Sequence, residues 1–103
     1  MAKALETVLE INLNALEHNY NYLKSKLKRN TKFLAVVKAF AYGSDAEKIA
    51  FHLQSLNVDY FAVAYTSEGV ALRNAGITKP ILVLHPQPLN FKTIIDNCLE
   101  PSL

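Results

Sequence analysis

Lys38 is the side chain best placed to do chemistry. It lies in the stretch AVVKAFAYGSD, residues 35–45, where six of the first seven residues are apolar. Lysines are rarely fully buried unless they are paired. A lysine held at a partly desolvated strand end has a lowered pKa and can act as a base or as a Schiff-base amine. A lysine whose stem lies on apolar surface while its ammonium group reaches solvent fits this position equally well.

The residues that follow Lys38 add groups suited to a phosphate. Tyr42 supplies a phenol, and Gly43 permits the close backbone approach that a bound phosphate needs. Ser44 and Asp45 begin a predicted helix, whose N-terminus attracts anions, although the Asp45 carboxylate opposes them. The Lys-x3-Tyr-Gly turn therefore fits a ligand that carries both an aldehyde and a phosphate.

The other reactive residue types have weaker contexts. Tyr65 and His85 follow apolar runs and are predicted to form pocket walls, not catalysts. His18 and His52 lie on predicted helices without carboxylate or cysteine partners at ligand spacing, so we expect no metal site. Cys98 shares the apolar face of a predicted helix and is expected to be a small core residue.

Parallel strands must position these residues. Apolar runs rich in β-branched and aromatic residues predict strands buried on both faces, at residues 32–38, 60–65 and 80–85. Helical spacing or capping residues predict helices at 44–56, from Thr66 or Ser67 to a terminator at Gly76, and from Asn90 onward. This alternation predicts an α/β fold with a parallel sheet, whose carboxyl edge gathers the reacting groups.

The N-terminal segment is predicted to add one more strand and one more helix. Residues 7–13 contain β-formers, and apolar residues recur at steps of three and four from Leu13 to Leu27. Three parallel strands with open edges make a poor finished sheet. We therefore expect residues 1–103 to be one truncated piece of a longer barrel or sheet.

Composition narrows the class of protein. The 103 residues are 50% hydrophobic and 19% charged, as in soluble globular domains, and the net charge of +2 is too small to indicate a nucleic-acid partner. The single cysteine fits a reducing compartment, and no apolar run approaches the roughly 20 residues of a membrane helix. We expect a cytoplasmic protein that binds neither nucleic acid nor membrane.

At AVVKAFAYGSD the sequence resembles the N-terminal part of bacterial alanine racemase. This family uses pyridoxal 5′-phosphate (PLP) and carries a Val-Val-Lys-Ala-x-Ala-Tyr-Gly motif on the first strand of a TIM-type (β/α)8 barrel. The resemblance covers effectively residues 1–103, because further segments fall in the family's order and near its spacing: EINLNALEHN, FAVAYTSEGVALRNAGI and PILVLH.

The resemblance implies roles for four residues. Lys38 would hold PLP covalently and exchange the α-proton on one face of alanine, and Tyr42 would hydrogen-bond the cofactor phosphate. Val36 and Leu84 would pack near the cofactor ring. The full-length protein would be a homodimer that converts L-alanine to D-alanine for peptidoglycan synthesis. The family's second base and most of its phosphate site lie further along, so this piece is expected to be inactive alone.

Two departures from the family pattern qualify this assignment. Phe40 stands where many members have Asn, and Ser44-Asp45 stand where they have His-Gly. This variant is similar to racemase modules fused behind a peptidoglycan-precursor ligase. Three alternatives stay open: a non-catalytic PLP-binding barrel of the PLP-homeostasis type, a related PLP-dependent decarboxylase, or an inert piece that self-associates through open sheet edges.

Overall fold

The computed structural model describes residues 2–37 and 44–102. They belong to two compact units, Met1–Thr31 and Lys32–Leu103, and each unit is described by itself. Within the described residues, no helix is both long enough and apolar enough to cross a membrane.

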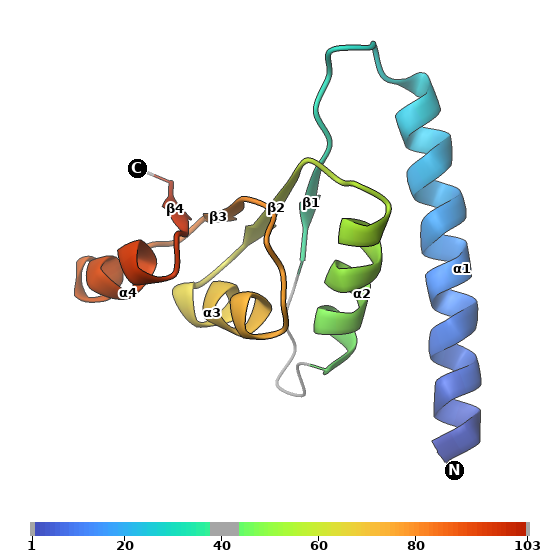
Figure 1. Cartoon of the computed structure of the whole chain (residues 1–103), viewed down its shortest axis with the longest axis horizontal. Coiled ribbons are helices and arrows are strands. Elements are labelled where there is room, and N and C mark those ends of the chain that lie inside the picture. Colours follow the sequence, from blue (N-terminus) through green and yellow to red (C-terminus); the bar gives the residue numbers. More distant parts are fainter. Residues whose placement is uncertain (1, 38–43, 103) are drawn as a thin grey trace. The chain divides into compact units, whose positions relative to one another are not determined.

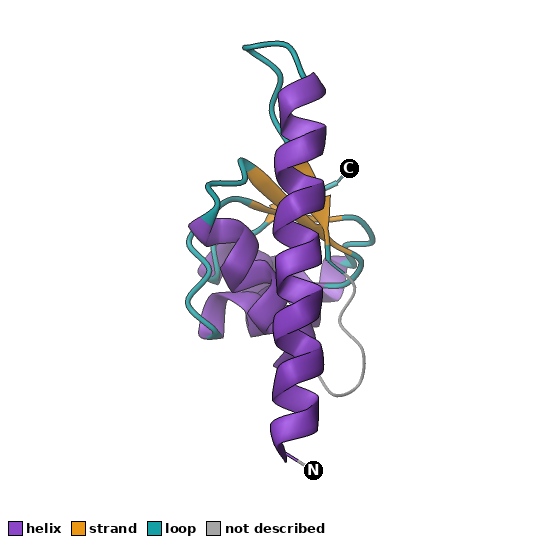
Figure 2. Cartoon of the chain, turned by 90° about the vertical axis from the view of Figure 1, so that its right-hand side faces the viewer, coloured by secondary structure: helices purple, strands orange, loops and turns teal. Residues whose placement is uncertain are grey.

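The first unit is a single continuous helix, α1 (Ala2–Lys26), followed by a turn (Figure 2). The strand predicted at residues 7–13 is therefore wrong. Residues 7–13 lie within a longer segment, residues 2–26, that is rich in Ala, Leu and Glu, which are strong helix formers. A strand also needs a neighbour to satisfy its backbone groups, and the described sheet pairs none with this segment. The helix predicted from Leu13 onward is confirmed, but it begins eleven residues earlier.

The second unit is built on a parallel sheet with the strand order β1-β2-β3-β4 (Figure 1). The first three strands are β1 (Leu34–Val36), β2 (Tyr60–Val63) and β3 (Ile81–Val83). Their predicted positions and parallel direction are confirmed. The prediction that they are buried on both faces is wrong for β1, because Leu34 and Val36 are exposed in the described chain. A short fourth strand, β4 (Glu100–Pro101), adds to β3 in the same direction.

Helices alternate with these strands. They are α2 (Ser44–Ser55), α3 (Thr66–Asn74) and α4 (Phe91–Asp96), the last preceded by the 3-10 turn η1 (Pro88–Asn90). Helix α3 packs on β2 and β3. The alternate strand residues that form the core on this face are completely buried: Phe61, Val63, Ile81 and Val83.

The three helices of the second unit end in the same way. Two residues beyond each helix, the backbone takes a positive φ: 69° at Asn57, 99° at Gly76 and 53° at Cys98. The residue after each positive φ donates its N–H to the carbonyl five residues earlier. These bonds run from Val58 to Leu53, from Ile77 to Leu72 and from Leu99 to Ile94. All six of these residues are buried. This is the Schellman motif with its accompanying apolar contact, used three times.

Two details of α3 and α4 differ from the sequence predictions. The N-cap of α3 is Tyr65, so Thr66 is the first helical residue instead of the cap. Helix α4 ends at Asp96, and Cys98 lies beyond it in the left-handed turn, where it is exposed instead of buried in the core.

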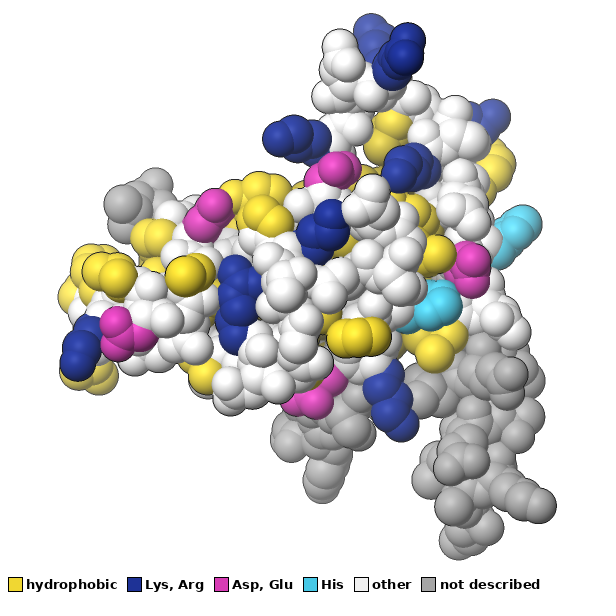
Figure 3. Space-filling model, in the orientation of Figure 1, with side chains coloured by type: hydrophobic (Ala, Val, Ile, Leu, Met, Phe, Trp, Pro, Cys, Tyr) yellow, Lys and Arg dark blue, Asp and Glu magenta, His cyan; other side chains and the backbone are white. Residues whose placement is uncertain are grey.

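Hydrophobic side chains gather on the surface over α4 (Figure 3). Ile94 is the buried residue of this short helix, whereas Leu89 is 89% exposed and Ile95 is 73% exposed. The apolar stripe predicted for this helix is therefore largely on the surface of the described chain.

Candidate functional site

The carboxyl ends of β1, β2 and β3 lie side by side at one end of the sheet. Val36 is level with Ala62, and Val63 with Val83. The ladder continues two residues past β3, because Leu84 N–H bonds the Val63 carbonyl and His85 N–H bonds the Ala64 carbonyl, both at 2.8 Å. In barrels of parallel strands, reacting groups gather at this edge.

Val36 and Leu84 belong to the open face of the sheet. Side chains alternate between the two faces of a strand, and the register groups Val36 with Ala62 and Leu82. Leu84 follows Leu82 by two residues and therefore shares this face. Val36 is 59% exposed and Leu84 is 39% exposed. These two apolar side chains are available to pack against a flat ring.

Lys38 and Tyr42, the residues with the most specific predicted roles, lie outside the described residues. Described strand β1 ends two residues before Lys38, at Val36. The sequence motif carries the argument for both residues.

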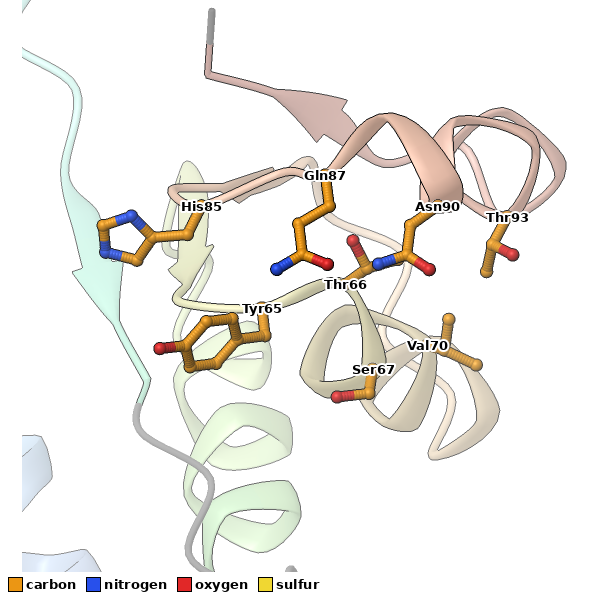
Figure 4. A pocket seen from close by; sticks show the side chains of 8 residues that line it. All are labelled: Tyr65, Thr66, Ser67, Val70, His85, Gln87, Asn90 and Thr93. Carbon is orange, nitrogen blue, oxygen red and sulfur yellow. The ribbon is translucent and has the colours of Figure 1, made fainter.

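Tyr65 and His85 do lie together, as expected of residues that end neighbouring strands. Their ring centroids are 5.8 Å apart, and the ring planes are inclined at 40°. Both line a cavity of about 510 Å³ that opens at the start of α3. Both residues therefore line a pocket, as expected of pocket-wall residues (Figure 4).

We call this cavity the α3 pocket. One side is the start of α3, with Tyr65, Thr66 and Ser67, and the other is the segment after β3, with His85, Gln87 and Asn90. None of these six side chains is acidic or carries a fixed positive charge.

Thr66 is the unusual member of the α3 pocket. Thr66 is 4% exposed, and its buried Oγ1 has no hydrogen-bond partner among the described residues. Sequence reasoning treated Thr66 as a helix cap and did not identify Gln87 or Asn90 as site residues. The signal that could have found them is the polar segment HPQPLN directly after an apolar strand.

The start of α3 is held by its own first turn. The Tyr65 N–H donates to Glu68 Oε1 at 2.8 Å, which is the carboxylate half of a capping box. Within residues 2–37 and 44–102, no group of three or more His, Cys, Asp and Glu residues could hold a metal ion.

Comparison with known proteins gives one consistent family. A family model described as "Alanine racemase, N-terminal domain" matches residues 11–103. An alanine racemase of Citrifermentans bemidjiense is 47% identical over 78 residues, which are 76% of this chain and 21% of that protein. Alanine racemase 1 of Caldanaerobacter subterraneus is 38% identical over 98 residues, covering 94% of this chain and 25% of that protein.

A solved structure agrees with these matches. The alanine racemase of Clostridium difficile 630 superimposes with a TM-score of 0.78 at 42% identity, over 85% of this chain and 24% of that chain. The present chain therefore spans about a fifth to a quarter of the length of these relatives.

Proposed function

Because this chain belongs to the family of alanine racemase N-terminal domains, we propose that it supplies the first part of a PLP-binding barrel in an enzyme that interconverts L-alanine and D-alanine. The observation that carries the proposal is the family match over residues 11–103, which includes the whole VVKAFAYG motif. Lys38 is the catalytic residue of the proposal, and Tyr42, Val36 and Leu84 complete this chain's share of the cofactor site.

The described residues fit such a cofactor. Val36 and Leu84 present exposed apolar surface on the open face of the sheet, near the carboxyl ends of β1 and β3. An aromatic ring buries such surface favourably. The exposure of both side chains supports placing the ring of PLP against this part of the sheet.

Each residue then has a definite task. PLP, when bound, supplies an electron-withdrawing ring that stabilises the electron pair left at Cα after proton removal. The Lys38 amine would hold the cofactor covalently until the amino group of alanine takes its place. The freed amine would then act as a general base and acid that removes or returns the α-proton on one face of alanine. The Tyr42 hydroxyl donates a hydrogen bond to the phosphate and thereby fixes the orientation of the ring.

Racemisation needs a second proton-transferring group on the opposite face of Cα, and we propose that it comes from the remainder of the full-length protein. The full-length protein would be a cytoplasmic homodimer that supplies D-alanine for peptidoglycan. The 103 residues alone would then bind PLP weakly and would not racemise alanine, because one lysine and one phenol provide few of the required contacts.

Covalent labelling of the full-length protein tests the role of Lys38. Incubation with PLP, reduction with borohydride and peptide mapping should place the label on Lys38, because reduction turns the lysine–PLP linkage into a stable secondary amine. Lys38→Ala should remove both the label and D-alanine formation, whereas Lys32→Ala, at an exposed lysine on the same segment, should keep both.

Label on another lysine, or no label, would contradict the proposal. Correct labelling without any conversion of alanine would favour a PLP-binding protein or a decarboxylase instead. The same procedure applied to the 103-residue chain should give little or no labelling. Stoichiometric labelling would show that this part of the site is sufficient for PLP binding.

A further inference from the structure

The α3 pocket suggests a binding function that does not depend on the role of Lys38. We propose that it binds a small oxyanion, a carboxylate or a phosphate group, at the N-terminus of α3. The site consists of the first N–H groups of α3, the buried hydroxyl of Thr66, and the side-chain amides of Gln87 and Asn90.

Backbone donors at the start of α3 provide the first set of contacts. The first N–H groups of a helix have no acceptor within the helix, which in α3 applies to Thr66 and Ser67. The Tyr65 N–H is already used by the Glu68 carboxylate. Helix α3 has nine residues, so its aligned peptide dipoles also favour a negative group at this end.

The Thr66 hydroxyl is an independent indication of a ligand. A buried hydroxyl without a partner is costly, because it has lost its water and gained nothing in exchange. The Thr66 side chain is turned toward Gln87 and Asn90 (Figure 4). An oxyanion in the α3 pocket would accept a hydrogen bond from this hydroxyl and remove the cost.

The opposite wall supplies further donors on a fixed backbone. Gln87 directly precedes the 3-10 turn η1 and Asn90 is its last residue, and the turn is closed by the Asn90 N–H bond to the Gln87 carbonyl at 2.8 Å. Each side-chain amide can donate two hydrogen bonds. The donors on the two walls are at least 20 residues apart in the chain, as expected for a built site and not for a single helix end.

Charge decides the class of ligand and limits its affinity. None of the side chains that line the α3 pocket is a carboxylate, so the site offers little to a hard metal cation. Glu68 lies in the first turn of α3 and opposes an anion, but its carboxylate is engaged with the Tyr65 N–H. With no Lys or Arg in the lining, we expect a dissociation constant on the order of millimolar.

Nuclear magnetic resonance of the whole 103-residue chain tests this site. Amide spectra would be recorded during titration with sodium phosphate and, separately, with sodium acetate, at ionic strength held constant with sodium chloride. Saturable shifts are expected at the Thr66 and Ser67 backbone amides and at the Gln87 and Asn90 side-chain amides. Saturation by phosphate alone or by acetate alone would support the site and identify the source of the oxyanion.

Two variants separate the site from general ion binding. Thr66→Val keeps the side-chain volume but removes the hydroxyl, and it should weaken binding about tenfold, since one charge-assisted hydrogen bond is lost. Thr31→Val, the same substitution at an exposed position in the turn after α1, should leave binding unchanged. The proposal is overturned by an absence of saturable shifts at these amides, by equal binding to Thr66→Val, or by a spectrum without the dispersion of a folded chain.

Discussion

Among the described residues of the second unit, the Arg73 side chain donates hydrogen bonds to four backbone carbonyls. Its guanidinium donates to the carbonyls of Lys79 at 2.7 Å and Ile77 at 3.0 Å, which precede β3. It also donates to the carbonyls of Asn97 and Cys98, both at 2.9 Å, which follow α4. One planar group thus joins the end of α3 to two turns that lie more than 15 residues apart.

We expect Arg73→Met to lower the free energy of unfolding by about 2–4 kcal/mol, because several carbonyls lose a charged donor at once. Arg73→Lys should recover only part of this loss, since an ammonium group cannot match the planar fork. Urea denaturation followed by circular dichroism measures both effects. Arg29→Met, at an exposed arginine, is the control and should change stability little. Equal stability of Arg73→Met and Arg29→Met would contradict this role.

At the scale of elements, the Schellman motifs at the helix C-termini predict that two substitutions change stability in opposite directions. Gly76→Ala should lower the free energy of unfolding by about 1 kcal/mol, because φ at this residue is 99° and residues with a Cβ atom disfavour that region. A steric clash does not cause this loss, since the new Cβ would lie 3.5 Å from the Phe51 ring, which is an ordinary van der Waals contact. Cys98→Gly should stabilise by up to about 1 kcal/mol, because it relieves the same backbone strain.

Thermal unfolding of the two variants measures these effects, with Ala75→Gly as the matched control. Ala75 has a φ of −80°, so glycine gains nothing there and should destabilise. A destabilised Cys98→Gly would show that the thiol side chain contributes more than the backbone strain costs.

The sequence predicted β1, β2 and β3 because each lies in an uninterrupted apolar run, and it predicted the helices of the second unit from apolar residues at helical spacing or from capping residues. Strand β4 was not among the strands predicted. The Schellman motifs were predicted only where glycine marks them, at Gly76. Asn57 and Cys98 adopt the same conformation without that signal, and for Cys98 the helical apolar spacing suggested a core residue. The failure at residues 7–13 has another cause, since β-formers there stand within a segment of strong helix formers that has no neighbouring strand in the described sheet.

The candidate site was predicted to a different extent. The family resemblance at the motif around Lys38 predicts a cofactor lysine, which lies outside the described residues and stays a prediction. The strand pattern predicted that Tyr65 and His85 lie at the carboxyl ends of neighbouring strands. The α3 pocket could not be derived in this way, because its walls meet only after β2, α3 and β3 have packed. Local sequence says nothing about which turn will face the start of α3.

At the scale of the whole chain, exposed apolar surface predicts self-association. Among the described strands, β1 is at one edge of the sheet, and open edges with apolar side chains pair readily with another copy. Val36→Lys should therefore reduce the dimer fraction of the 103-residue chain in sedimentation velocity. Leu89→Lys, which places the same charge on the apolar surface over α4, should have a smaller effect. The reverse order would identify α4 as the contact.

The strand order also has a consequence for how the protein is made. In the described sheet, β2, β3 and β4 each pair with the strand that precedes them in the chain. When the ribosome releases one of these strands, its partner has therefore already emerged, and the connection to be closed is the helical segment between the two strands. Among the described strands, β1 waits for β2, and each later strand can pair as soon as it emerges. The sheet can thus grow from β1 outward during synthesis, with open edges at β1 and at the newest strand.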